Sequence, residues 1–77
     1  MNKPTVPEVL PKVQAYYQNN PAGGNLHIVL EDGNVNDSHV QFCLEQASRK
    51  GDNEGVDLAQ LLMRMTKTQR LKLRAQH

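Results

Sequence analysis

Two residue types that bind metals, His39 and Cys43, stand four positions apart in a stretch with helical periodicity. This spacing places both side chains on one face of a helix, where they could contact the same ion. A zinc site takes three or four ligands from the protein, and the only other histidines are His27 and His77. We therefore interpret Cys43 as a small core residue and His39 as a polar residue of a first helical turn. We expect no metal and no cofactor.

His27 could form an acid–base pair with the neighbouring carboxylate of Glu31 or Asp32. A histidine beside an apolar run is more often structural, and nothing else in the sequence supports catalysis. The sequence contains no glycine-rich phosphate-binding loop and no GxSxG nucleophile motif. We therefore expect no catalytic residue and no enzymatic activity.

The stretch 32–37 has oxygen-bearing side chains at alternate positions, as in the first half of a calcium loop. The sixth position of that loop requires glycine and the twelfth an acid, but the residues here are Asp37 and Cys43. A turn followed by a helix cap explains the same residues without an ion. We expect no calcium site.

Positive charge gathers at the C-terminal end of the sequence, although the net charge is only +1. Residues 58–77 contain no Asp or Glu and hold these cations: Arg64, Lys67, Arg70, Lys72 and Arg74. Such a set would neutralise phosphates and give salt-sensitive binding to nucleic acid or to an acidic partner. Cations near a helix C-terminus are also favourable in their own right, and a pI of about 7.9 is low for a DNA-binding domain. Nucleic-acid binding by these residues is our alternative hypothesis.

The chain has 77 residues, which predicts one small domain over 1–77 with frayed ends at 1–4 and 75–77. Aromatic residues make up only 4%, so the core must be mainly aliphatic. A single cysteine excludes an intramolecular disulfide and favours a reducing compartment. The sequence has no apolar run long enough to cross a membrane and no signal-peptide pattern, so we expect a cytoplasmic protein that does not bind membranes.

The N-terminal part predicts a helix that starts irregularly. Thr5 and Glu8 fit a capping box, but Pro11 would remove a helical hydrogen bond. We therefore predict a loose turn at 5–10, a helix at 11–18 and a flexible loop at 19–25.

The next apolar run predicts one short β-strand or extended segment. Its residues are Leu26, His27, Ile28, Val29 and Leu30. The sequence offers no second strong strand, so this segment would be bonded to loops, pair with a second copy in a homodimer, or extend a partner's sheet. The last two outcomes would make the protein an association module.

The remaining sequence predicts a helical hairpin around Gly51. Val40, Cys43 and Ala47 follow helical spacing before the glycine, and Asp52 can cap the helix after it. The pattern from Thr66 to Gln69 predicts a capping box that opens a short basic helix. The fold class is therefore mainly α, more exactly α+β, with three to four short helices and one extended segment.

A set of residues after the Gly-Gly loop carries a resemblance to known proteins: Asp32-Gly33-Asn34, Asp37-Ser38-His39-Val40, Cys43, Gly51-Asp52, Glu54-Gly55-Val56, Leu61-Leu62, Met65, Thr68-Gln69-Arg70 and Lys72-Leu73. In their spacing, the stretch 26–73 resembles a type of small uncharacterised protein encoded by bacteriophages and prophages. The resemblance implies a bacterial host cytoplasm and an accessory protein that acts by binding, as an inhibitor or adaptor of a host factor, including host defence. It implies no activity and assigns no role to any residue.

The leading hypothesis from the sequence is therefore a non-enzymatic phage or prophage accessory protein. Its partner would be a host or phage protein, and it would also bind itself.

Overall fold

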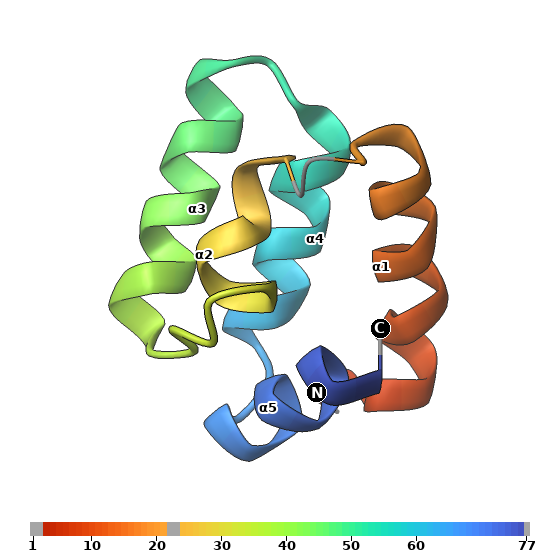
Figure 1. Ribbon diagram of the computed structural model, residues 1–77. Helices are drawn as coiled ribbons and strands as arrows, with labels where there is room; N and C mark the ends of the chain where they lie inside the picture. The colour runs from red at the N-terminus through yellow and green to blue at the C-terminus, as the bar shows by residue number, and fades with distance from the viewer. Residues whose placement is uncertain (1–2, 22–23, 77) are drawn as a thin grey trace.

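The structure is a computed structural model that describes residues 3–21 and 24–76, and these residues form helices and connecting turns without any strand (Figure 1). The elements in chain order are α1 (Val6–Asn19), a 3-10 turn η1 (Gly24–Leu26), α2 (His27–Leu30), α3 (Asp37–Arg49), α4 (Asn53–Met63) and α5 (Lys67–Gln76). The predicted helical class is confirmed.

Helices α3 and α4 form the predicted antiparallel hairpin (Figure 1). Gly51 makes the reversal with φ +70°, a conformation that other residues adopt only with strain. Asp52 then caps α4, because its Oδ1 accepts a hydrogen bond of 3.0 Å from the backbone N–H of Gly55. Local sequence chemistry therefore fixes this half of the fold.

Helix α1 packs against α4 and α5, and the short α2 lies across α3. The core between them is aliphatic apart from Tyr16 and Cys43, as the composition predicts. Its fully enclosed side chains include those of Val13, Leu30 and Leu62. In the described part of the chain, no helix is both long and apolar enough to span a membrane.

The predicted strand at 26–30 is wrong, because these residues form η1 and α2. The backbone is satisfied locally: the N–H groups of Glu31 and Asp32 both donate to the carbonyl of His27, at 2.9 and 3.0 Å. The buried side chains are Leu26, Val29 and Leu30, which is helical spacing and not alternation. A five-residue apolar run fits both periods, and without a second strand the helix leaves fewer backbone groups unpaired. Residues 26–30 thus offer no strand edge to a second copy or to a partner's sheet.

The predicted loose turn at 5–10 is also wrong, because α1 continues through Pro11 from Val6 to Asn19. Proline inside a helix costs about 3 kcal/mol, and here a stripe of buried side chains offsets that cost: Val6, Val9, Val13 and Tyr16. The expected cap at Thr5 does not form either, since its hydroxyl donates to the Glu8 carboxylate at 3.0 Å and accepts nothing from the helix.

The second predicted capping box is confirmed at the start of α5. Thr66 Oγ1 accepts from the N–H of Gln69 at 3.1 Å, and Gln69 Oε1 accepts from the N–H of Thr66 at 2.9 Å. Of the predicted loop at 19–25, residues 22–23 lie outside the described residues. The same is true of 1–2 and 77 in the predicted frayed ends, whereas residues 75–76 belong to α5.

Candidate functional site

The basic set predicted to bind nucleic acid does not form one surface, because Arg70 is only 1% exposed. Its Nε donates to the carbonyl of Leu62 at 2.7 Å, and its Nη1 donates to the carbonyl of Val35 at 2.7 Å. The same Nη1 lies 2.8 Å from Oδ1 of Asp37. Arg70 therefore joins the end of α4 to the start of α3 from within the core and is not accessible to a phosphate.

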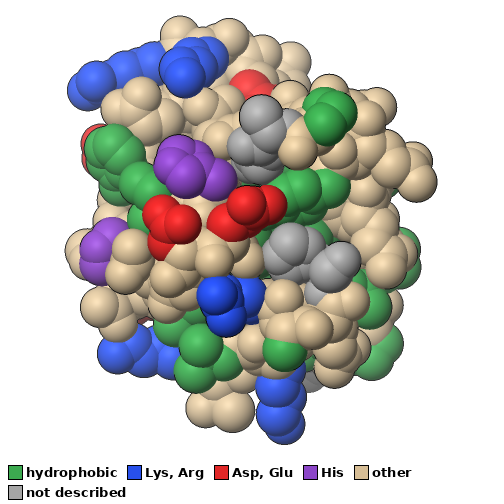
Figure 2. Space-filling view, in the orientation of Figure 1, with side chains coloured by type: hydrophobic (Ala, Val, Ile, Leu, Met, Phe, Trp, Pro, Cys, Tyr) green, Lys and Arg blue, Asp and Glu red, His purple; other side chains and the backbone are tan. Residues whose placement is uncertain are grey.

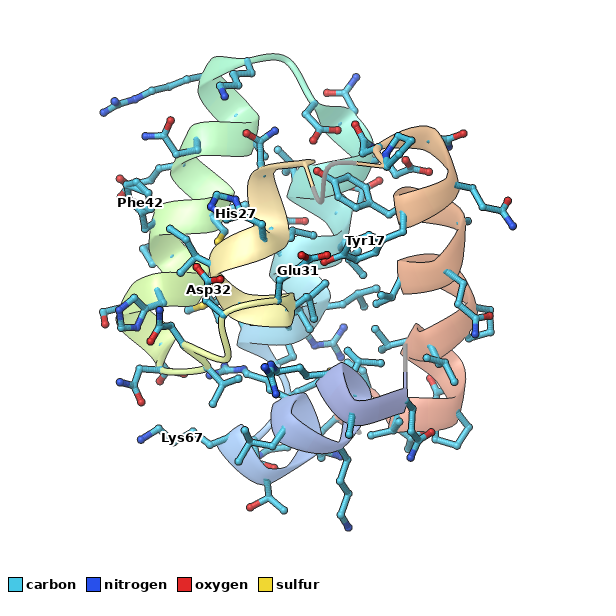
Figure 3. All side chains as sticks on the ribbon, viewed as in Figure 1. Tyr17, His27, Glu31, Asp32, Phe42 and Lys67 are labelled. Atoms are coloured by element: carbon cyan, nitrogen blue, oxygen red, sulfur yellow. The ribbon has the colours of Figure 1, made fainter. Side chains whose placement is uncertain are left out.

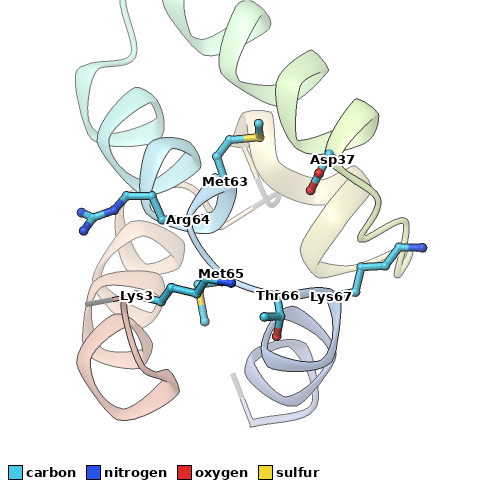
Figure 4. A pocket seen from close by; sticks show the side chains of 7 residues that line it. All are labelled: Lys3, Asp37, Met63, Arg64, Met65, Thr66 and Lys67. Carbon is cyan, nitrogen blue, oxygen red and sulfur yellow. The ribbon is translucent and has the colours of Figure 1, made fainter. Parts of the chain in front are cut away.

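The other four predicted cations have different surroundings. Nη2 of Arg74 donates to the carbonyl of Glu31 at 2.9 Å, which connects α5 to the end of α2. Arg64, Lys67 and Lys72 are exposed. Arg64 and Lys67 line an open depression of about 530 Å³ at the junction of α4 and α5, together with Lys3 (Figure 4).

The residues considered for metal binding do not form a metal site. Among the described residues, no group of three or more His, Cys, Asp or Glu side chains lies close enough to hold an ion. Cys43 is fully buried, and its burial raises the pKa of the thiol. A smaller fraction of the side chain is therefore present as the reactive thiolate. His39 is half-buried on the same helix.

His27, Glu31 and Asp32 lie on the same face of the molecule (Figure 3). Nδ1 of His27 lies 3.3 Å from the carbonyl oxygen of Gly24. The face is open to solvent, since all three residues are exposed. The stretch 32–37, which we interpret from the sequence as a turn and helix cap, forms the turn before α3 and the first residue of α3, with Asn36 at the N-cap position.

A polar network ties the start of α4 to α1 and η1. The hydroxyl of the fully buried Tyr16 donates to Oδ2 of Asp52 at 2.7 Å and accepts from the N–H of Asn25 at 2.9 Å. The amide of Asn25 donates to the same Oδ2 at 2.9 Å. Each of these polar groups has a hydrogen-bond partner, so the network holds the start of α4 to α1 and η1.

Both tyrosines of the chain should resist ionisation. Burial, and then the hydrogen bond to the Asp52 carboxylate, raises the pKa of Tyr16 to about 12. Burial and then the charge of Glu31 raise the pKa of Tyr17 above its usual value. Because the folded pKa values exceed those of the unfolded chain, the stabilisation is complete below pH 10 and is lost as the pH rises toward 12.

A spectrophotometric titration tests this prediction. The native protein should develop almost no tyrosinate absorbance at pH 10, whereas the chain in urea should titrate with a midpoint of about 10. Half-maximal absorbance of the native protein at pH 10 would show that the two hydroxyls are accessible to water and contradict the network.

A shallow groove of about 290 Å³ lies between α2 and α3, and we call it the α2–α3 groove. Its side-chain lining consists of Asn25, His27, Ile28, Phe42, Gln46 and Lys50. Phe42 is 44% exposed, and in the described part of the chain only Leu71, at 50%, is another large apolar side chain with such exposure. Phe42 and His27 line the same groove, and Figure 3 shows Glu31 and Asp32 on the same side of the molecule. Figure 2 shows that red acidic side chains lie next to a purple histidine on this face.

Sequence reasoning did not single out Phe42 as a functional residue. A signal was present, since position 42 lies beside the buried stripe at Val40, Cys43 and Ala47 and not within it. An aromatic ring on the polar side of an amphipathic helix is exposed and therefore available for contact.

Comparison with known proteins identifies no relative: no protein-family model, curated protein or solved structure matches the chain.

Proposed function

We propose that this protein is a small non-enzymatic module that binds another protein through the α2–α3 groove. The observation that carries the proposal is the exposure of Phe42, the only Phe in the chain, at the edge of this groove. The two tyrosines are enclosed by the fold, Tyr16 completely and Tyr17 in large part. Exposed aromatic side chains beside a groove are typical anchors of protein interfaces, where a few residues carry most of the binding energy.

The charges around the groove favour an amphipathic helix as the occupant. Lys50 lies at the C-terminal end of α3, while Glu31 and Asp32 follow the C-terminal end of α2 (Figure 3). A helix lying in the groove would place apolar side chains on Phe42 and Ile28. Its acidic end would face Lys50 and its basic end the two carboxylates, which also agrees with the direction of a helix dipole.

The resemblance to small phage and prophage proteins bears on the identity of the proposed partner and on the effect of binding. It suggests that the partner is a host or phage protein in a bacterial cytoplasm, and that binding inhibits or redirects a host factor such as a defence complex.

The test compares two variants that each remove one exposed apolar side chain. Phe42→Ala shortens the proposed anchor, and Leu71→Ala removes a similarly exposed side chain on α5. Tagged wild type and both variants are used to capture proteins from nuclease-treated bacterial lysate, and the affinity of each retained protein is then measured. We expect a partner held by wild type and Leu71→Ala, and about 30-fold weaker binding to Phe42→Ala, which is about 2 kcal/mol.

Equal affinity for wild type and Phe42→Ala would contradict the proposal. So would an equal loss with Leu71→Ala, because it would indicate non-specific apolar adhesion. Sedimentation of the purified chain tests the remaining possibility, which is that a second copy of this chain occupies the groove. A dimer that Phe42→Ala dissociates, with no other protein retained, would replace the partner helix by a second copy.

A further inference from the structure

Four cations from separate parts of the chain line two adjoining depressions, one at the junction of α4 and α5 and one between α1 and α4. Lys3, Arg64 and Lys67 line the depression described above, and Arg64 also lines an adjoining depression of about 540 Å³ with Lys12. Arg64 thus connects the two depressions. We call these four exposed side chains the basic strip: Lys3, Lys12, Arg64 and Lys67.

Three acidic side chains line the hollows along the basic strip, fewer than its four cations. Asp37 lines the first depression, but its carboxylate holds the buried guanidinium of Arg70 at 2.8 Å, which neutralises it. Asp57 lies in the second depression near Lys12, and Glu54 lies with these two residues in a further hollow between α1 and α4. The carboxylates of Glu31 and Asp32 lie instead on the α2 face (Figure 3). The strip is therefore a positive surface on a protein whose net charge is only +1.

The cations are spread out and do not converge on one point. Figure 4 shows Arg64 and Lys67 extending to opposite sides of the first depression, with Lys3 between them. A single phosphate is held by donors that converge on it, whereas a chain of phosphates is followed by cations spaced along a surface. The depression also exposes the thioether of Met63 and the hydroxyl of Thr66, which offer apolar and polar contacts to a sugar.

We propose that the basic strip binds the phosphodiester backbone of a nucleic acid without reading its sequence. This site differs from the C-terminal helix considered from the sequence, because Arg70 is buried, and it brings in Lys3 and Lys12, which lie far from that helix in the sequence. It is also separate from the α2–α3 groove, so one protein could hold a partner protein and a nucleic acid together.

The test measures fluorescence anisotropy of labelled single-stranded and duplex DNA over a range of salt concentrations. For the duplex, the slope of log K against log salt should be about −3 to −4 if all four cations contact phosphates. The changes Lys12→Gln, Arg64→Gln and Lys67→Gln should each make the slope less steep by about 1. Lys72→Gln is the matched control, since it removes an exposed lysine of α5 that lines neither depression, and it should leave the slope unchanged.

Three results would overturn this proposal. The first is no binding of either DNA at low salt by a chain whose circular dichroism shows it to be folded. The second is a slope that Lys72→Gln reduces as much as the strip variants do. The third is competition by polyglutamate, at equal charge concentration, as strong as competition by unlabelled DNA, which would assign the strip to an acidic protein.

Discussion

Replacing Arg70 by Met is expected to lower the free energy of unfolding by about 2–4 kcal/mol, because the guanidinium is buried and donates charged hydrogen bonds to backbone carbonyls. The change keeps much of the buried volume but removes every donor. The carbonyl of Val35 loses its charged partner at 2.7 Å. The carbonyl of Leu62, near the end of α4, loses its hydrogen bond to α5. In a domain of this size the loss corresponds to a fall in Tm of about 10–25 °C.

Two other variants separate the effect of the guanidinium from that of the charge. Arg70→Lys keeps the charge but cannot reach the carbonyls of Leu62 and Val35 together, so it should lose a large part of the same stability. Lys72→Met removes an exposed cation from the same helix and should change the unfolding free energy by less than about 0.5 kcal/mol. Urea unfolding measures all three. Equal stability of Arg70→Met and Lys72→Met would show that the buried contacts of Arg70 do not hold the fold together.

Replacing Asp52 by Ala is expected to cost about 2–3 kcal/mol, because one carboxylate performs two structural tasks. It caps α4 through the N–H of Gly55, a contribution of about 1 kcal/mol. It also accepts hydrogen bonds from Tyr16 and Asn25, and its removal leaves the buried Tyr16 hydroxyl without its acceptor, at a further cost of about 1–2 kcal/mol. Asp57→Ala, an exposed acid on the same helix, is the matched control for urea unfolding.

The network also predicts a response to acid. Burial of the Asp52 carboxyl opposes its ionisation, but hydrogen bonds from Tyr16, Gly55 and Asn25 outweigh this and hold its pKa below the usual 3.8. Because the folded pKa is the lower one, the stabilisation is complete above pH 3.8 and is lost as the pH falls through the folded value. Wild type should therefore lose more stability than Asp52→Asn between pH 5 and pH 2. Parallel losses in the two proteins would contradict the assigned network.

The parts of the fold that sequence reasoning found are those that local chemistry determines. Gly51, Asp52 and the pair Thr66 and Gln69 act on backbone groups within a few residues, so a short pattern identifies them. The prediction for the segment 26–30 failed because four apolar residues and one histidine fit a strand and a helix equally. The choice depended on where Leu26, Val29 and Leu30 could be buried, and that is a property of the whole fold.

The candidate sites also depend on the whole fold and not only on nearby residues. Arg70 and Arg64 look alike in the sequence, yet one is enclosed by α3, α4 and α5 and the other is exposed. The burial of an arginine depends on acceptors such as the carbonyl of Val35, which lies 35 positions away in the chain. In the same way, Lys3 and Lys12 could not be assigned to the basic strip before the fold placed α1 beside α4.

The central claim, that a partner protein covers the α2–α3 groove, is tested most directly by photo-crosslinking in bacterial cells. Phe42→p-benzoylphenylalanine keeps an aromatic ring at the proposed anchor and forms a covalent bond to whatever lies against it. Leu71→p-benzoylphenylalanine places the same group at the other exposed apolar position. We predict a discrete adduct with another protein from position 42, resistant to nuclease and absent from position 71. The same adducts from both positions, or none from position 42, would contradict the account.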